Sequence, residues 1–355
     1  MNASSQKNWP VITENIKSKL RTLGCDLVGI APVADFPELE RFEKWLQLGF
    51  EGEMDYLHRH LDKSLHPEAI LPSVQSVLVC GMNYDTTRPR SIDQRDDAHG
   101  WISRYAWGDD YHGILEAVLV RAVEWLQVQF PDMEYRLYAD TGPTRDRIWA
   151  KYAGLGWFGK NSNLVNLKSG SFFFIGEIFL SLPLKPDKPA AERCGSCTRC
   201  IESCPTGAIV EPGVIDSRKC ISYLTIELRG FIPEKFRGPI GRQLFGCDIC
   251  QDVCPWNRKN SKTQKRAFEP RAPFFNPGLT EFYRTVRDEF TNRFRKSAIK
   301  RTKQKGLLRN ISVAMGNTGN PAFLPELEEM AVHQDPAVKA HAEWAIQKIE
   351  TEEIR

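Results

Sequence analysis

The chain has 355 residues, of which 41% are hydrophobic and 26% charged, and its formal net charge is +3. These values are typical of a globular protein with two or three domains, and they exclude a low-complexity chain. The N-terminus lacks the basic region and apolar run of a signal peptide, and no Arg-Arg pair occurs. We therefore expect a cytoplasmic protein that does not associate with membranes.

Residues 1–187 form the first predicted domain, a mixed α/β unit. Apolar runs in SVQSVLVCGMNY (73–84) and EYRLYAD (134–140) predict strands, and the spacing in YHGILEAVLVRAVEWLQVQF (111–130) predicts an amphipathic helix. The most apolar stretch, SFFFIGEIFLSLPL (171–184), is too short to span a membrane and indicates a buried strand. Cys25 and Cys80 lie in apolar surroundings and are expected to be small core residues.

This domain carries no motif for a nucleotide cofactor, because both the dinucleotide and the nucleoside triphosphate glycine fingerprints are missing. The phrase DYHGIL (110–115) is close to the D-x-H-x-x-G signature of cobalamin sites, whose histidine binds cobalt. However, Leu115 stands where that signature has its final glycine, and the phrase opens a predicted helix. We therefore do not expect His112 to be a cobalt ligand.

Residues 188–265 form a cysteine-rich module, in which eight cysteines lie within 61 residues. Such clustering in a reducing compartment indicates metal rather than disulfides. CGSCTRCIESCP (194–205) has the spacing of the ligand run of bacterial ferredoxins, whose fourth cysteine binds the other cluster. GCDICQDVCPWN (246–257) nearly repeats it but lacks the first cysteine, for which Cys220 is the remaining candidate. The pattern predicts two 4Fe–4S clusters, one held by Cys194, Cys197, Cys200 and Cys254 and the other by Cys204, Cys220, Cys247 and Cys250.

Zinc is the alternative, since paired C-x2-C knuckles also form tetrahedral zinc sites. A zinc site takes four ligands from two knuckles, whereas this chain has a contiguous run of four followed by proline. The doubled pattern therefore favours iron–sulfur clusters.

Residues 266–355 form a predicted helical domain with a strongly basic first part. Residues 256–310 contain 16 Lys or Arg and 4 Asp or Glu, and the segment 291–310 has no acidic residue. A solvated helix face would have mixed charges, so this stretch favours a polyphosphate partner. The turn-forming segments GNTGNP and HQDP divide this region into short predicted helices, which resemble a HEAT-type repeat. The predicted nucleic-acid contacts are Arg293, Arg295, Lys296, Lys300, Arg301, Lys303 and Lys305.

Several motifs occur in an order and at distances that resemble epoxyqueuosine reductases, from about residue 10 to the C-terminal helices. They are both cysteine runs and ISRYAWGDDYH (102–112), YADTGP (138–143), GLGWFGKNSNLV (154–165) and GSFFFIGEI (170–178). The resemblance implies a multidomain α+β protein. Its domains would be an N-terminal domain related to flavin nitroreductases and cobalamin-processing proteins, a ferredoxin-like module, and a HEAT-like domain that holds tRNA.

The resemblance also implies an activity. Family members reduce the epoxide of epoxyqueuosine at the wobble position of tRNA to queuosine, the last step of queuosine biosynthesis. Two 4Fe–4S clusters pass electrons to cobalamin bound in a base-off form. The expected partners are tRNA carrying epoxyqueuosine and an electron donor of the ferredoxin or flavodoxin class, and the protein is expected to be a monomer.

The family's proton donor corresponds to Asp140, which lies at the end of a predicted strand, where desolvation could keep its carboxyl protonated. The structural alternative is an aspartate that forms a turn or caps the next helix. Matching motifs place the remaining cobalamin contacts at Lys63, Ser103, Tyr105, Asn161, Leu164, Ile175, Cys247 and Asp248.

Two other functions stay open at this point. A ferredoxin-type electron-transfer protein would have the clusters but would not need the YADTGP motif. A cytosolic reductive dehalogenase-like enzyme would share the cobalamin and the clusters, but a small neutral substrate would not need the basic segment.

Overall fold

The computed structural model describes residues 7–94 and 96–353. Its N-terminal part is built on a four-stranded antiparallel sheet. In spatial order the strands are β1 (Leu27–Pro32), β2 (Ser76–Asn83), β7 (Phe173–Leu180) and β4 (Tyr135–Tyr138). The strands predicted within 73–84, 134–140 and 171–184 are confirmed as β2, β4 and β7.

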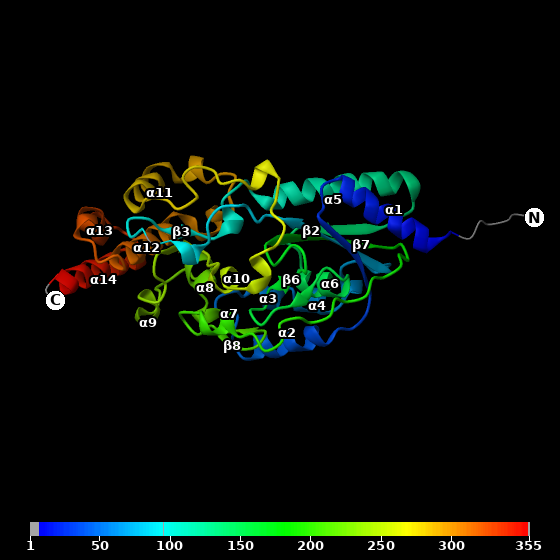
Figure 1. Ribbon diagram of the computed structural model, residues 1–355, viewed down its shortest axis with the longest axis horizontal. Coiled ribbons are helices and arrows are strands. Elements are labelled where there is room, and N and C mark those ends of the chain that lie inside the picture. The colour runs from blue at the N-terminus through cyan, green and yellow to red at the C-terminus, as the bar shows by residue number, and fades with distance from the viewer. Residues whose placement is uncertain (1–6, 95, 354–355) are drawn as a thin grey trace, which may run out of the picture.

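Helices cover both faces of this sheet: α1 (Trp9–Thr22) and α5 (Tyr111–Gln129) lie on one face, and α2 (Pro37–Gln47) and α6 (Asp146–Tyr152) on the other (Figure 1). Successive residues of β2 point to opposite faces, so Leu78 and Cys80 pack toward α1 and α5, while Val77 and Val79 pack toward α2 and α6. Covering both faces explains why the central strands are apolar throughout. Cys25 and Cys80 are both buried, as predicted.

The cysteine module contains only short elements and turns. These are α7 (Arg199–Glu202), β8 (Ile209–Glu211), β9 (Val214–Ile215), α8 (Ile221–Ile226), α9 (Glu234–Arg237), β10 (Gln243–Phe245) and α10 (Ile249–Asp252). Short elements also occur in the N-terminal part: α3 (Tyr56–Arg59), α4 (Leu61–Leu65), β3 (Trp101–Ile102), β5 (Trp157–Phe158) and β6 (Leu164–Val165). Strand β10 pairs in parallel with β3, which ties the module to the N-terminal part.

The C-terminal part is helical, as predicted, and consists mainly of α11 (Leu279–Arg293), α12 (Lys303–Gly316), α13 (Leu324–Ala331) and α14 (Pro336–Glu353). The molecule is elongated, with α1 and α14 at opposite ends (Figure 1). Trp101 and Trp107 pack with Phe245 and with these helices in one hydrophobic core. The core of the C-terminal helices therefore includes residues from the first two of the three predicted domains.

Buried polar side chains strengthen this connection. Asn310 of α12 donates hydrogen bonds to the carbonyl oxygens of Thr225 and Leu244, at 2.8 and 2.9 Å. Arg309 donates to the carbonyl oxygens of Leu224, Leu228 and Gly230. Because these carbonyl groups are in or next to α8 and β10, helix α12 is fixed directly onto the cysteine module. Across residues 7–94 and 96–353, no helix is both long and apolar enough to cross a bilayer.

Candidate active site

Asp140 lies in a strained turn directly after β4. Its φ is +68°, and the N–H of Thr141 donates a 2.8 Å hydrogen bond to the carbonyl oxygen of Ala139, which closes a γ-turn around Asp140. A non-glycine residue in this conformation is sterically disfavoured and persists only where its surroundings hold it. The turn points the carboxylate outward, and its side chain is 53% exposed.

Two side chains from the start of α5 contact the Asp140 carboxylate. Tyr111 donates its hydroxyl hydrogen to Asp140 Oδ2 at 2.5 Å, and His112 Nε2 lies 3.1 Å from the same oxygen. The other nitrogen of His112, Nδ1, is 2.6 Å from Asp110 Oδ1. Asp110 also caps α5 by accepting the backbone N–H of His112. Both imidazole nitrogens thus face carboxylates.

Aromatic packing fixes this group against the sheet. The Tyr111 ring stacks on Phe174 of β7 with centroids 4.1 Å apart and planes 2° apart, and His112 stacks on Tyr111 at 4.1 Å. Tyr105 meets Tyr111 edge-on at 6.1 Å and lies 5.9 Å from Phe245, the last residue of β10. A continuous set of rings therefore leads from the Asp140 carboxylate to the cysteine module.

The protonation state of Asp140 differs from the prediction that burial keeps its carboxyl protonated. Burial alone would raise the pKa of Asp140, but hydrogen bonds from His112 and Tyr111 outweigh it and lower the pKa. Burial likewise opposes the charged form of His112, yet its bonds to Asp110 and Asp140 raise its pKa to about 9. The expectation that desolvation keeps Asp140 protonated is therefore wrong for this structure. At neutral pH the proton is on His112, and Asp140 is a carboxylate.

Four of the predicted cofactor contacts gather beside the second cysteine run. Ser103 Oγ donates to Asp248 Oδ1 at 2.5 Å, and the same carboxylate accepts the backbone N–H of Arg104 at 2.7 Å. Asn161 Nδ2 donates to the carbonyl oxygen of Cys250 at 3.1 Å. Ser103, Asp248 and Asn161 are at most 3% exposed. Their polar groups thus bind the module itself, and Tyr105 lies between them and Asp140.

The remaining predicted contacts are more dispersed. Leu164 is 3% exposed and packs in the core between the sheet and α6. Ile175 is the one partly exposed residue of β7 and lies next to Phe174 in sequence. Lys63 is exposed on α4, and its neighbour Ser64 donates a 3.4 Å hydrogen bond to the carbonyl oxygen of Pro143, three residues after Asp140.

The spacing predicts that the eight clustered cysteines form two groups of four, and one of these groups lines a single cavity. Cys194, Cys197, Cys200 and Cys254 line one cavity of about 240 Å³, together with Asn161 and Trp256. In the other group, the pKa of Cys250 is raised well above the ordinary value by burial and by the neighbouring Cys220 and Cys204. Burial and Cys250 also raise the pKa of Cys247 well above the ordinary value, and Cys220 adds to this effect.

The raised pKa values of these thiols indicate whether the cysteines fit metal clusters. Cys247 and Cys250 are buried near other cysteines, so their thiols resist deprotonation unless positive charge is placed among them. Iron in a cluster supplies that charge, and cysteine thiolates are its usual ligands. The eight cysteines therefore fit two clusters.

The seven basic residues predicted to contact nucleic acid are all exposed, but two of them have acidic partners. Arg301 pairs with Glu227 at 2.9 Å and lies 5.5 Å from the centre of the Tyr56 ring, and Lys305 pairs with Asp335 at 3.2 Å. Within the described ranges the other five have no ion-pair partner; they are Arg293, Arg295, Lys296, Lys300 and Lys303. The charge of Arg301 also contributes to lowering the pKa of Asp140, which places this end of the basic segment near the site.

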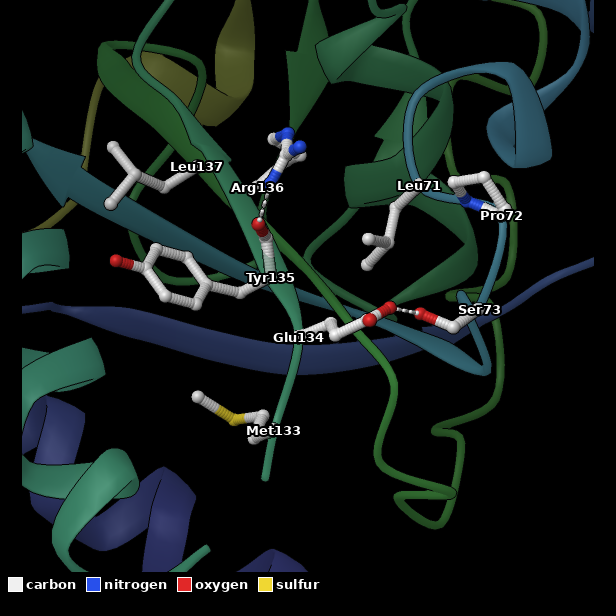
Figure 2. Close-up of a pocket in the computed structure, with 8 residues that line it drawn as sticks. All are labelled: Leu71, Pro72, Ser73, Met133, Glu134, Tyr135, Arg136 and Leu137. Atoms are coloured by element: carbon white, nitrogen blue, oxygen red, sulfur yellow. Dashed lines mark hydrogen bonds between the residues drawn. The ribbon is translucent and has the colours of Figure 1, made fainter. Parts of the chain in front are cut away.

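A larger cavity, of about 750 Å³, lies away from these residues. It is formed by residues 71–73 and 133–137, at the end of β4 opposite to Asp140, and a hydrogen bond from Ser73 to Glu134 lies on its wall (Figure 2). It contains none of the predicted site residues.

Sequence reasoning considered His112 as a cobalt ligand and did not recognise it as the partner of Asp140. The available signal was the phrase DDYH, which places an acid, a phenol and an imidazole in four consecutive residues at a helix start. What the sequence did not reveal is that α5 begins beside the end of β4, so that these side chains meet Asp140.

Two family models match parts of this chain. Residues 193–257 match the family model of a 4Fe–4S double cluster binding domain, and residues 65–141 match the model described as epoxyqueuosine reductase QueG, DUF1730. The fold and the two cysteine groups thus define an iron–sulfur oxidoreductase with a double-cluster module.

Full-length relatives give the family. The chain is 40% identical over 342 residues to the epoxyqueuosine reductase of Salmonella typhimurium, which covers 96% of this chain and 89% of the relative. It is also 44% identical over 305 residues to the epoxyqueuosine reductase of Leadbetterella byssophila, covering 84% of this chain and 97% of the relative. The chain belongs to the epoxyqueuosine reductase family.

Solved structures are similar over the same length. A crystal structure of epoxyqueuosine reductase with an epoxyqueuosine-modified tRNA-Tyr stem loop has a TM-score of 0.87 at 31% identity, covering 96% of this chain and 90% of that chain. The Bacillus subtilis enzyme, with its catalytic aspartate loop swung out of the active site, has a TM-score of 0.86 at 30% identity, with the same coverage.

Proposed function

We propose that this protein reduces the epoxide of epoxyqueuosine at the wobble position of tRNA to give queuosine. The observation that carries the proposal is the Asp140–His112 pair in a chain of this family that also contains the double-cluster cysteine module. In the overall reaction both C–O bonds of the epoxide break and a C=C bond forms. The oxygen leaves as water after taking up two protons, and two electrons are consumed.

The protons are the part of the reaction that this chain's own residues supply. His112 carries a proton at neutral pH and is 3.1 Å from Asp140 Oδ2, while Tyr111 donates to that same oxygen. A proton can pass from His112 to the Asp140 carboxylate and from there to the departing oxygen, with Asp140 as the group that touches the substrate. Within the described ranges, Asp140 Oδ1 accepts no hydrogen bond, so it is the oxygen available to the substrate. Rotation of the half-exposed carboxyl would then bring a proton taken up at Oδ2 to the substrate.

The electrons require the two cofactors that the family implies. Cys194, Cys197, Cys200 and Cys254 would hold one 4Fe–4S cluster, and Cys204, Cys220, Cys247 and Cys250 the other. When bound, cobalamin would supply the reducing centre that acts on the epoxide carbons.

Several features fit a cobalamin site between Asp140 and the second cysteine group. Tyr105, Ser103 and Asn161 each contact a residue of the segment 245–250, and Ile175 is the partly exposed position of β7. Both nitrogens of His112 are engaged by carboxylates, so His112 would not be available as a metal ligand. Lys63 and Leu164 complete the proposed set, with less support from their positions.

The basic segment would bind the phosphates of the anticodon stem. Lys300 and Lys303 have no acidic partner among the described residues, and Arg301 lies close enough to affect the charge of Asp140. A wobble base leaving its stack could then reach the site while the stem stays on the C-terminal helices.

We further propose an N-terminal domain of the nitroreductase-like and cobalamin-processing-like type and a C-terminal domain of the HEAT-like type. An electron donor of the ferredoxin or flavodoxin class and a cytoplasmic, monomeric protein complete the proposal. A reducing compartment suits the eight cysteines, which the clusters need as thiolates.

A single anaerobic assay tests the proposed reaction. Protein with reconstituted clusters and cobalamin is incubated with a strong reductant and tRNA that contains epoxyqueuosine, and the nucleosides are analysed by mass spectrometry. We expect the modified nucleoside to lose the mass of one oxygen atom. An unchanged nucleoside, with iron and cobalt both present in the protein, would refute the proposed reaction.

A further inference from the structure

The loop that carries Asp140 is attached at both ends to one residue of the neighbouring strand. Tyr138, the last residue of β4, is the register partner of Glu177 in β7. At the other end, Thr144 Oγ1 donates a 2.8 Å hydrogen bond to Glu177 Oε2. Thr144 is 6% exposed and Glu177 is 1% exposed. Asp140 lies between these two attachment points.

The path of the loop makes such an attachment necessary. Asp140 has a positive φ, which is unfavourable for a residue with a side chain. Two residues on, Gly142 lies so close to Tyr138 that a Cβ would be 2.4 Å from a carbon of its ring. The chain therefore folds back tightly over the end of β4. Without a fixed far end, the loop could relax to a conformation in which Asp140 points elsewhere.

Glu177 has a buried carboxyl that the proposed reaction does not use. Among the described residues its Oε1 has no hydrogen-bond partner, and Thr144 is the partner of Oε2. Burial, reinforced by the nearby Asp146, raises the pKa of Glu177 well above the ordinary range. A buried carboxyl in the middle of an apolar strand lowers stability unless hydrogen bonds compensate for its lost hydration, and the hydrogen bond from Thr144 is the one that Glu177 accepts among the described side chains.

We propose that the Thr144–Glu177 hydrogen bond holds the loop 139–144 in the conformation that presents Asp140 to the substrate. Thr144 and Glu177 are then positioning residues, which act on the reaction through Asp140. This inference rests on the proposed function for its activity measurement but not for its structural one.

Substitutions at Thr144 separate the hydroxyl from the shape of the side chain. Thr144→Val removes the hydrogen bond and keeps the shape, whereas Thr144→Ser keeps the hydroxyl. We expect Thr144→Val to lower kcat for epoxyqueuosine reduction by about 10- to 100-fold, with KM for tRNA changed by less than about twofold, because misplacing a reacting group affects turnover. Thr144→Ser should retain most of the activity. Thr22→Val, on the exposed end of α1, is the matched control.

Hydrogen–deuterium exchange tests the same idea without turnover. In the purified full-length protein, amides of residues 139–144 should exchange faster in Thr144→Val and in Glu177→Leu than in the wild type. They should stay protected in Thr144→Ser and in Glu177→Gln, which keeps an acceptor oxygen. The strand amides of β7 report whether each variant is folded.

The outcomes separate the two proposals. Wild-type protein that does not reduce epoxyqueuosine would refute the proposed function, while the exchange experiment would still test the loop. An active wild type whose Thr144→Val variant matches it in kcat and in loop exchange would overturn the positioning role. A fall in kcat that Thr144→Ser shares equally would also overturn it, because the hydroxyl would then not be the cause.

Discussion

The Tyr111 hydroxyl donates a 2.5 Å hydrogen bond to Oδ2 of Asp140, the same carboxylate oxygen that lies 3.1 Å from His112 Nε2. The two donors come from adjacent residues at the start of α5, and they leave the other oxygen of Asp140 exposed. In the proposed reaction this arrangement would separate two tasks, since one oxygen would receive a proton from within the protein and the other would face the substrate. It also makes the pKa of Asp140 depend on two side chains of α5, a helix that precedes β4 in the chain.

Asp140→Asn tests the proton-transfer role directly. Asparagine accepts a positive φ better than most residues, so we expect the turn and the fold to be retained. An amide cannot pass on a proton, and turnover should fall by about 100-fold or more. Iron content, cobalamin binding and tRNA affinity serve as controls and should be unchanged. Turnover near the wild-type level would return Asp140 to the role of a turn-forming residue.

His112 predicts a pH-dependent contribution to stability. Its ordinary pKa of 6.5 is raised to about 9 in the folded protein, so the protonated form stabilises the fold. This contribution is fully present below pH 6.5 and is lost as the pH rises through about 9. We expect the difference in Tm between wild type and His112→Gln to shrink over this interval. The effect should be small because the His112 and Asp140 side chains are 31% and 53% exposed.

Thermal unfolding at a series of pH values measures this difference, with His333→Gln in the C-terminal part as the control. A Tm difference between wild type and His112→Gln that stays constant from pH 6.5 to about 9 would contradict the proposed charge state.

The basic segment predicts a graded dependence of tRNA binding on salt. Lys300 and Lys303 have no acidic partner within the described ranges, so replacing both with alanine should reduce the slope of log K against log salt by about 1.5 to 2. Arg301 and Lys305 are already paired with Glu227 and Asp335, and replacing them should change the slope less.

Affinities measured by filter binding over a salt series check this ranking. Replacing Lys19 and Arg21 of α1, at the opposite end of the molecule, is the control (Figure 1). Equal slopes for all variants would remove the basic segment from the tRNA site.

Single cysteine substitutions test the assignment of the clusters. Cys254→Ala removes a ligand of the first group and Cys220→Ala a ligand of the second, so each should lower iron content from about eight atoms per chain toward about four. The electron paramagnetic resonance spectrum of the reduced protein should lose a different signal in each variant. Cys25→Ala, in the core beside Cys80, should keep all of its iron. Full iron content in Cys220→Ala would leave the second group without its assigned fourth ligand.

Local patterns predicted the elements of this protein well. Strands β2, β4 and β7 and helix α5 were expected from periodicity, because each buries a regular set of apolar side chains. The prediction of these elements needs no contacts between residues far apart in sequence. The assignment of the eight cysteines to two clusters stays a prediction, and it joins distant residues, Cys254 to Cys194 and Cys204 to Cys247.

Long-range packing set the limits of prediction. The pairing of β10 with β3, and the packing of Trp101 and Trp107 with the C-terminal helices, depend on residues more than a hundred positions apart. The lowered pKa of Asp140 was missed for the same reason, because its cause is the position of Tyr111 and His112. Likewise, the pairing of Arg301 with Glu227 shows that a run of basic residues overstates the charge that is free to bind phosphate.

The positive φ of Asp140 means that the residue best suited to the backbone at this position differs from the residue needed for the proposed reaction. Glycine adopts this conformation without steric hindrance, so the backbone alone favours glycine at position 140. A selection for thermal stability alone would weigh this backbone gain against the lost hydrogen bonds from Tyr111 and His112, and it would not detect the loss of the carboxylate from the candidate active site. Libraries derived from this chain should therefore keep residue 140 fixed, and stability should be sought elsewhere in the molecule.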